Sequence, residues 1–265
     1  MTENIVVTGG ASGIGAAVAA RLVDRNFTIW NLDLEACPLP GVRNIICDIA
    51  DRDSVDQAIV MLPDSIRTVI HVAGIAQCQS DPSQVIRVNF FGLRFLNEQL
   101  TEKIVVGGQV LIVASSAGRD WWDNSSVVAA MLALTTLEQE EAWLVAHQLD
   151  WQQDPYKISK QCAAAYTYLA CLAGKQRHIR VNCINPGITE TPLSDSFREL
   201  LGQERYDSIV EETGRSGKPD DVAAVVEMLV LMETEWLNGV EMTVDGGYFA
   251  SIQAAALNVR GDTQA

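Results

Sequence analysis

The stretch "TGGASGIG", residues 8–15, separates a short apolar run from an amphipathic segment. The run "NIVVT" (4–8) is rich in β-branched residues and predicts a strand, whereas residues 13–24 predict a helix. Glycine permits a tight turn and a close approach of the backbone to a pyrophosphate, which the free N–H groups at a helix N-terminus attract. A glycine turn between the first strand and the first helix therefore predicts a dinucleotide-binding site.

Apolar runs and helical patterns continue to alternate along the chain. Further strands are expected at 27–33, 42–48, 67–73, 108–116, 179–185 and 239–245. Helices are expected near 51–61, within 82–102, from Pro155 onward and over 219–232. Apolar strands separated by helices indicate a parallel sheet that is buried on both faces. The sequence therefore predicts a single α/β domain over 1–265, with a doubly wound parallel sheet of the Rossmann type that binds ligands at the carboxyl ends of its strands.

The second predicted strand ends in an acid, Asp33, which lies 18 residues after Gly15. A carboxylate that binds the hydroxyls of an adenine ribose is expected at an offset of about 20 residues. Such an acid repels a 2′-phosphate, and neither "GGAS" nor "DLE" contains Lys or Arg. The sequence therefore favours NAD(H) over NADP(H), with a solvated loop acid as the alternative for Asp33.

Composition restricts the partners and the location. The 265 residues carry a net charge of -15 at pH 7, and an acidic surface repels nucleic-acid backbones and anionic lipid. No run reaches the roughly 18 apolar residues of a membrane span, and the N-terminus leaves no room for a signal peptide. The six cysteines show neither CxxC pairing nor zinc-like spacing, so we expect no metal site and a cytoplasmic protein with reduced thiols.

A second motif, "DPYKISK" (154–160), sets Tyr156 four residues before Lys160. Asp154 can cap a helix and Pro155 suits its first position, so the phenol and the ammonium share one helix face. An isolated tyrosine has a pKa of about 10, which a nearby positive charge lowers. The pair is therefore a candidate general acid or base, although an ordinary helix surface would account for this motif alone.

Taken together, these motifs resemble the short-chain dehydrogenase/reductase family, whose TGxxxGxG fingerprint is followed much later by YxxxK. The resemblance extends from Ile5 to about Tyr248. The further matches, in order, are Asp48 with Ile49, "HVAG" (71–74), "VNFFG" (88–92), "VASSAG" (113–118), "RVNCINPGITETPL" (180–193), "GRSGKPDDVA" (214–223) and "VDGGY" (244–248).

The resemblance implies a catalytic tetrad of Asn89, Ser116, Tyr156 and Lys160. Tyr156 would exchange a proton with the substrate oxygen, and Ser116 would hydrogen-bond the same oxygen. Lys160 would lower the pKa of Tyr156 and bind the nicotinamide ribose, while Asn89 would hold a water that connects Lys160 to solvent. Ser115 and Ser116 face opposite ways if the strand continues, and the family pattern favours the second.

The same resemblance implies the cofactor contacts. Asp48 would meet the adenine amine, "NPG" (185–187) would face the nicotinamide, and Thr191 would bind its carboxamide. His71 departs from the family's more usual Asn-Asn-Ala-Gly and is interpreted as a packed strand residue. The complete set of expected contacts is Gly9, Ser12, Gly13, Ile14, Gly15, Asp33, Asp48, Ile49, Ala73, Gly74, Tyr156, Lys160, Pro186, Gly187 and Thr191.

The 40 residues from Ser116 to Tyr156 far exceed the family's dozen or so. The extra segment, 119–152, carries four of the six tryptophans and predicts a helical insertion before the catalytic tyrosine. It could cover the active-site mouth, form a subunit interface or simply pack on the domain. With "ETPL" (190–193), it is similar to the bacterial 3α-hydroxysteroid dehydrogenase/carbonyl reductase branch, which implies a homodimer or other homo-oligomer. The region 193–217 would close over the substrate with its apolar side chains Leu193, Phe197, Leu200, Leu201 and Tyr206, or else form ordinary amphipathic helices on the core.

These features predict an NAD(H)-dependent oxidoreductase that interconverts a secondary alcohol and a ketone. The expected substrate is an apolar small molecule, cyclic or steroid-like as in the branch that the chain resembles. A small carbonyl, a sugar or a biosynthetic intermediate is the first alternative. A non-catalytic NAD(H)-binding sensor or scaffold is the second, although such proteins typically lose the tyrosine or the lysine.

Overall fold

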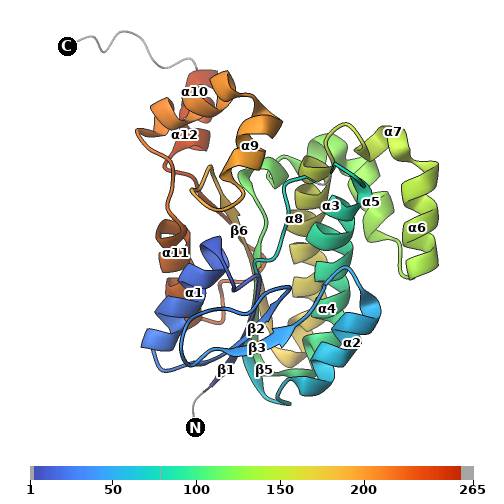
Figure 1. Cartoon of the computed structure of the whole chain (residues 1–265), viewed down its shortest axis with the longest axis vertical. Helices are drawn as coiled ribbons and strands as arrows, with labels where there is room; N and C mark the ends of the chain where they lie inside the picture. Colours follow the sequence, from blue (N-terminus) through green and yellow to red (C-terminus); the bar gives the residue numbers. More distant parts are fainter. Residues whose placement is uncertain (1–2, 78, 258–265) are drawn as a thin grey trace.

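The computed structural model describes residues 3–77 and 79–257, so Cys78 and the two ends of the predicted domain 1–265 lie outside the described residues. Seven parallel strands form one sheet in the order β3-β2-β1-β4-β5-β6-β7 (Figure 1). The strands are β1 (Asn4–Thr8), β2 (Thr28–Asp33), β3 (Arg43–Ile46), β4 (Ile66–His71), β5 (Ile104–Val113), β6 (Arg180–Pro186) and β7 (Glu241–Val244). The predicted doubly wound α/β fold is confirmed.

Helices cover both faces of the sheet (Figure 1). The bounds are α1 (Gly13–Asp24), α2 (Arg52–Met61), α3 (Ser83–Ile86), α4 (Leu93–Leu100), α5 (Ser125–Leu132), α6 (Leu137–Ala146), α7 (Gln148–Trp151), α8 (Pro155–Gly174), α9 (Ser194–Leu201), α10 (Gln203–Thr213), α11 (Pro219–Leu231) and α12 (Tyr248–Ala256). α1 and α11 pack on one face over Val7 and Ile70, and α2, α4 and α8 pack on the other over Val6 and Val69. α9, α10 and α12 lie above the carboxyl ends of the strands.

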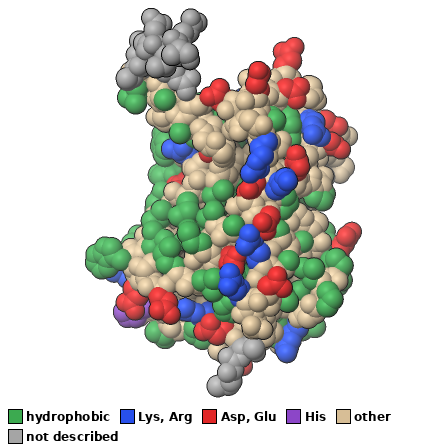
Figure 2. Space-filling view, turned by 90° about the vertical axis from the view of Figure 1, so that its left-hand side faces the viewer, with side chains coloured by type: hydrophobic (Ala, Val, Ile, Leu, Met, Phe, Trp, Pro, Cys, Tyr) green, Lys and Arg blue, Asp and Glu red, His purple; other side chains and the backbone are tan. Residues whose placement is uncertain are grey.

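The outer surface of α1 and α11 is charged. Figure 2 shows this face, where basic and acidic side chains alternate. Arg21 of α1 binds both Asp220 and Glu227 of α11, and Arg25 binds Glu227. These ion pairs join the first and last large helices of this layer.

Two predicted elements differ from those observed. The strand expected at 108–116 already ends at Val113, because the chain turns at Ser115 into a 3₁₀ segment, Ser116–Gly118. The helix expected within 82–102 is divided by a π-helical segment, Arg87–Gly92. Both departures place polar side chains beside the carboxyl end of the sheet, where π-helical turns and irregular backbone often accompany functional sites.

The insertion (119–152) forms α5, α6 and α7 on the outer side of the helices that cover the sheet (Figure 1). Trp143 and Trp151 are buried in the same hydrophobic core as α4 and α8. Glu140 of α6 is also buried, and its carboxylate binds Arg94 of α4 at 2.5 Å and Arg52 of α2 at 2.6 Å. The insertion is therefore packed on the domain through both apolar contacts and a buried ion-pair network.

Candidate functional site

A cavity of about 850 Å³ lies at the carboxyl ends of the central strands. Residues of β2, β5, β6 and β7 line it, together with residues that directly follow β1, β3 and β4, as expected for a doubly wound sheet. All but one of the predicted site residues line it, namely Gly9, Ser12, Gly13, Ile14, Gly15, Asp33, Asp48, Ile49, Ala73, Gly74, Ser116, Tyr156, Lys160, Pro186, Gly187 and Thr191. Asn89 does not line the cavity but lies behind the lining residue Gly74, where a Cβ atom on Gly74 would lie 3.0 Å from the Asn89 Oδ1.

The cavity end beside β1 has the shape that a dinucleotide requires. Gly9 has a φ of +74°, and a Cβ atom there would lie 2.7 Å from the Ala73 Cα. A Cβ atom on Gly15 would overlap the carbonyl oxygen of Gly9. Both positions therefore need glycine, and the first turn of α1 lines the cavity with its backbone. These residues fit a dinucleotide whose pyrophosphate lies at the α1 N-terminus.

Two acids follow the next strands of the sheet. The Asp33 carboxylate, at the end of β2, accepts a hydrogen bond from the Ala11 N–H at 2.9 Å, so it lies against the glycine turn. Asp48 follows β3 and accepts one from the Ala50 N–H at 2.9 Å. Both line the cavity at the positions where the adenine ribose and the adenine amine were expected.

Sequence reasoning missed the role of Thr8. Its hydroxyl accepts hydrogen bonds from the N–H groups of Val72 and Ala73, at 3.0 and 3.1 Å. These bonds hold the chain after β4 against the glycine turn after β1. The only sequence signal was the position of Thr8 at the start of "TGGASGIG".

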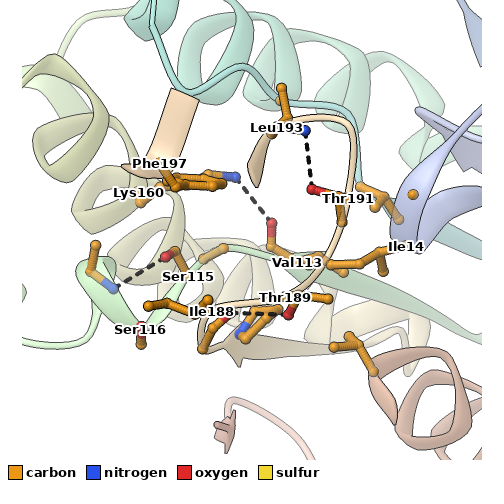
Figure 3. Close-up of a pocket in the computed structure, with 18 of the residues that line it drawn as sticks. Ile14, Val113, Ser115, Ser116, Lys160, Ile188, Thr189, Thr191, Leu193 and Phe197 are labelled. Atoms are coloured by element: carbon orange, nitrogen blue, oxygen red, sulfur yellow. Dashed lines mark hydrogen bonds between the residues drawn. The ribbon is translucent and has the colours of Figure 1, made fainter. Parts of the chain in front are cut away.

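Tyr156 and Lys160 lie at the other end of the cavity, both buried. Burial raises the pKa of Tyr156 to about 12, although a hydrogen bond with the Ser115 side chain opposes that rise. Burial also lowers the pKa of Lys160 to about 8, while its Nζ donates to the Val113 carbonyl at 3.3 Å (Figure 3). In this structure, burial has the largest influence on the pKa of Tyr156, and the Ser115 hydrogen bond, rather than Lys160, opposes it.

Asn89 lies in the π-helical segment and is completely buried. Its Oδ1 accepts from the Ile75 N–H at 2.8 Å, and its Nδ2 donates to the Ile75 carbonyl at 2.9 Å and to the Ser159 hydroxyl at 3.1 Å. A Cβ atom on Gly74 would lie 3.0 Å from the Asn89 Oδ1 and 3.2 Å from the Lys160 Nζ. Gly74, which follows β4, thus leaves room for both the Asn89 amide and the Lys160 ammonium, since a side chain at this position would crowd each of them.

The structure brings Ser115, rather than Ser116, to the tyrosine. Ser115 is extended, with a φ of -175°, and its side chain both hydrogen-bonds Tyr156 and accepts from the Ala117 N–H at 3.2 Å (Figure 3). Ser116 also lines the cavity, but it already belongs to the following 3₁₀ segment. The alternation rule does not apply here, since β5 ends two residues before Ser115.

Comparison with known proteins agrees with this geometry. A model described as short chain dehydrogenase matches residues 3–135, and a model described as enoyl-(acyl carrier protein) reductase matches residues 141–249. The chain belongs to the short-chain dehydrogenase/reductase family.

This dehydrogenase has relatives that match it over almost their whole length. A coniferyl-alcohol dehydrogenase of Pseudomonas sp. strain HR199 is 30% identical, over 92% of this chain and 96% of the relative. A 3-alpha-hydroxysteroid dehydrogenase/carbonyl reductase of Comamonas testosteroni is 25% identical, over 92% and 95%. The NADH complex of the 3-alpha-hydroxysteroid dehydrogenase from Pseudomonas sp. B-0831 superimposes with a TM-score of 0.78 at 23% identity, over 95% of this chain and 99% of the other.

The insertion of this dehydrogenase contributes little to the cavity. Of its described residues, only Asp120 lines the cavity wall. Trp122 is 53% exposed, whereas Trp143 and Trp151 face the core. Within the described residues, most of the insertion packs on the domain, and it meets the cavity at its edge, where Asp120 lines the wall and the Arg119 guanidinium lies 3.4 Å from the ring centroid of the lining residue Phe249.

Side chains of 193–217 and α12 form the apolar wall beside Tyr156. Phe197 lies edge-on to the Tyr156 ring, with 5.1 Å between the ring centroids. The other apolar side chains of this wall are Leu193, Leu200, Leu201, Ile209, Phe249 and Ile252. Tyr206 was expected here too, but it is buried and does not line the cavity.

Neither a membrane span nor a metal cluster is found in the described part of the chain. None of its helices is both long enough and apolar enough to cross a bilayer. Across 3–77 and 79–257, no three His, Cys, Asp or Glu side chains gather in a way that could hold a metal ion.

Proposed function

We propose that the protein is an NAD(H)-dependent oxidoreductase that interconverts an alcohol and a ketone on an apolar, ring-containing substrate. The observation that carries the proposal is one cavity with two complementary ends. The glycine turn and Asp33 lie at one end, and the buried Tyr156 and Lys160 lie at the other. The acid at the end of β2 favours NAD(H), since a carboxylate beside the adenine ribose would repel a 2′-phosphate.

The nicotinamide, when bound, supplies or accepts the hydride. In the direction of ketone reduction, the Tyr156 hydroxyl would donate its proton to the substrate oxygen. The Ser115 hydroxyl would donate a hydrogen bond to the same oxygen, so we propose Ser115 for the role first assigned to Ser116. Lys160, when protonated, would stabilise the phenolate that remains on Tyr156. Asn89 would hold α8, the helix that carries Lys160, through its hydrogen bond to the Ser159 hydroxyl.

The apolar wall around Phe197 supports the substrate class. An apolar cavity wall binds ring systems because it removes them from water, whereas a sugar would leave its hydroxyl groups without partners there. Two relatives are named for coniferyl alcohol and for 3-alpha-hydroxysteroids, which also supports an apolar substrate.

We further propose a homodimer or other homo-oligomer in the cytoplasm. The five cysteines of the described chain are free thiols, which suits a reducing compartment. Trp122, Tyr168 and Leu172 are exposed, and Trp121 joins the first two through ring contacts of 5.9 Å. Such a patch supports a subunit contact. Light scattering should give the mass of more than one chain, and a monomer at micromolar concentration would rule the assembly out.

The first experiment is a fluorescence titration with NADH and NADPH, followed by turnover of cyclic ketones, a 3-oxosteroid, coniferyl alcohol and a sugar. We expect tighter binding of NADH and turnover of the ring-containing substrates. Preference for NADPH would contradict the role of Asp33. Turnover of the sugar alone would contradict the apolar substrate.

A further inference from the structure

Glu241, the first residue of β7, joins three elements that are distant in the sequence. Its Oε1 accepts hydrogen bonds from the Tyr168 hydroxyl of α8 at 2.6 Å and from the Trp121 Nε1 at 3.3 Å. Its Oε2 accepts from the Asn185 Nδ2 of β6 at 2.8 Å. One carboxylate thus contacts the start of the insertion, the catalytic helix and the strand that leads into the cavity.

All three donors to Glu241 are uncharged. Glu241 is half-buried, whereas two fully buried acids of the protein bind arginines: Glu140 binds Arg52 and Arg94, and Glu227 binds Arg21 and Arg25. Within the described residues, no cation lies within ion-pair distance of Glu241. The carboxylate is therefore held by directed hydrogen bonds, which are stronger to a charged acceptor than to a neutral one.

Of the three donors to Glu241, Asn185 is the one that connects this carboxylate to the cavity. Its side chain is completely buried, and its Oδ1 accepts from the Cys183 thiol at 3.3 Å while its Nδ2 donates to Glu241. It opens the NPG turn (185–187), whose Pro186 and Gly187 line the cavity. The Gly187 N–H donates to the Val244 carbonyl at 2.9 Å, and a Cβ atom on Gly187 would lie 2.7 Å from the Asp245 Cβ. The NPG turn is thus held tightly against β7.

We propose that Glu241 is a positioning residue that holds the NPG turn in place for the nicotinamide, with the insertion and α8 anchored to the same carboxylate. A carboxylate suits this role because it offers only acceptors to three converging donors. A glutamine would replace one of the two acceptor oxygens by an NH₂ group, which is a donor. At least one of the three donor side chains would then lose its acceptor. Burial and the Glu241 charge both raise the pKa of the neighbouring Cys183 thiol, in keeping with a carboxylate close to the NPG turn.

The inference rests on the proposed binding of NAD(H), and E241Q tests it with two readouts. We expect the Kd for NADH to rise about tenfold, because one buried donor at the NPG turn loses its acceptor. We also expect the Gly187 amide to exchange its hydrogen faster than in the wild type when no NADH is present. Failure of the wild type to bind NADH would refute the proposed function, whereas the hydrogen exchange would still decide the role of Glu241.

Two control variants separate positioning from general stability. E227Q weakens two ion pairs between α1 and α11, so it should lower the melting temperature without changing the Kd for NADH. Y168F removes one donor but leaves the bond from Asn185, so it should keep the Kd within about twofold of the wild type. An unchanged Kd and unchanged Gly187 exchange in E241Q would overturn the proposal.

E241D is the second variant if E241Q does not fold. It keeps the charge but withdraws the carboxylate by one methylene, so that it cannot reach all three donors. We expect weaker NADH binding in the same direction as for E241Q. Wild-type affinity in E241D would contradict the need for the full reach of Glu241.

Discussion

The two ends of the active-site cavity are built in different ways. The cofactor end is formed by backbone and short side chains from consecutive strand ends, with Gly9 and Gly15 close to other main-chain atoms. The substrate end is formed by large side chains from separate elements, such as Phe197 of α9 and Phe249 of α12. The first end can tolerate few substitutions, because the backbone itself makes the surface. The second can change with single side chains, and this difference predicts which variants alter cofactor binding and which alter substrate binding.

Substitution of Tyr156, which lies between the two ends of the cavity, should have the largest effect on activity. Tyr156→Phe removes the hydroxyl that transfers the proton but keeps the buried ring. We expect kcat to fall by at least about 10³-fold, near the upper range for general acid–base catalysis, with little change in the Kd for NADH. Steady-state kinetics and a fluorescence titration measure the two quantities. Normal turnover by this variant would refute the mechanism.

Substitutions of Ser115 and Ser116 test which serine lies beside the Tyr156 hydroxyl during the reaction. Ser115→Ala should lower kcat about 100-fold, as expected for the loss of one hydrogen bond to a developing charge. Ser116→Ala is its matched control and should keep kcat within about threefold. The reverse order would restore the assignment of Ser116 that the family pattern favoured.

The free energy of unfolding of the protein should depend on pH through His71, the last residue of β4. Burial lowers the pKa of His71 to about 4, and its Nε2 contacts the Asn97 Oδ1 at 3.2 Å. His71 binds a proton more readily in the unfolded chain than in the folded one. The contribution of the neutral, buried His71 to the free energy of unfolding is therefore fully present above pH 6.5 and is lost as the pH decreases toward 4. We expect the wild type to lose about 2 kcal/mol from this group between pH 7 and pH 5.

His71→Asn removes this titration and isolates the effect. Urea unfolding at pH 7 and pH 5 should show a smaller loss of stability in His71→Asn than in the wild type. All other titrating groups are common to both proteins, so they cancel in the difference. An equal loss in both proteins would mean that His71 is solvated or charged at pH 5.

Asp33→Asn addresses the cofactor end alone. The amide cannot repel a 2′-phosphate, and it loses the charge that binds the ribose hydroxyls. We expect the Kd for NADH to rise about tenfold and the preference over NADPH to shrink, while the KM for the ketone changes little. A change in ketone KM without a change in NADH affinity would contradict the division of the cavity into two ends.

Phe197→Ala addresses the substrate end and should have the smallest effect. The variant removes apolar surface beside Tyr156, so we expect the ketone KM to rise about fivefold while NADH affinity is retained. Ring-containing ketones should be affected more than small ones, and a comparison of the two measures this directly. Equal effects on both substrates would argue against Phe197 as part of the substrate wall.

Several features followed directly from the sequence because they depend on local backbone rules. The alternation of strands and helices, the glycine turn and the spacing of Tyr156 and Lys160 all lie where they were predicted. The placement of Ser115 beside Tyr156 did not follow, because it depended on the residue at which β5 ends. The tryptophans of the insertion could not be placed from their number or spacing, since those properties do not say which helix they contact.

The sequence by itself determined the sheet, the glycine turn after β1 and the placement of Tyr156 and Lys160 one turn apart on α8. These properties arise from glycine conformations, helix periodicity and strand order, which act over a few residues at a time. Tertiary structure alone decided that Tyr156 is buried, which raises its pKa, and that Glu241 joins Trp121, Tyr168 and Asn185. Desolvation and long-range hydrogen bonds depend on how distant elements pack, and that packing is set only when the whole domain folds.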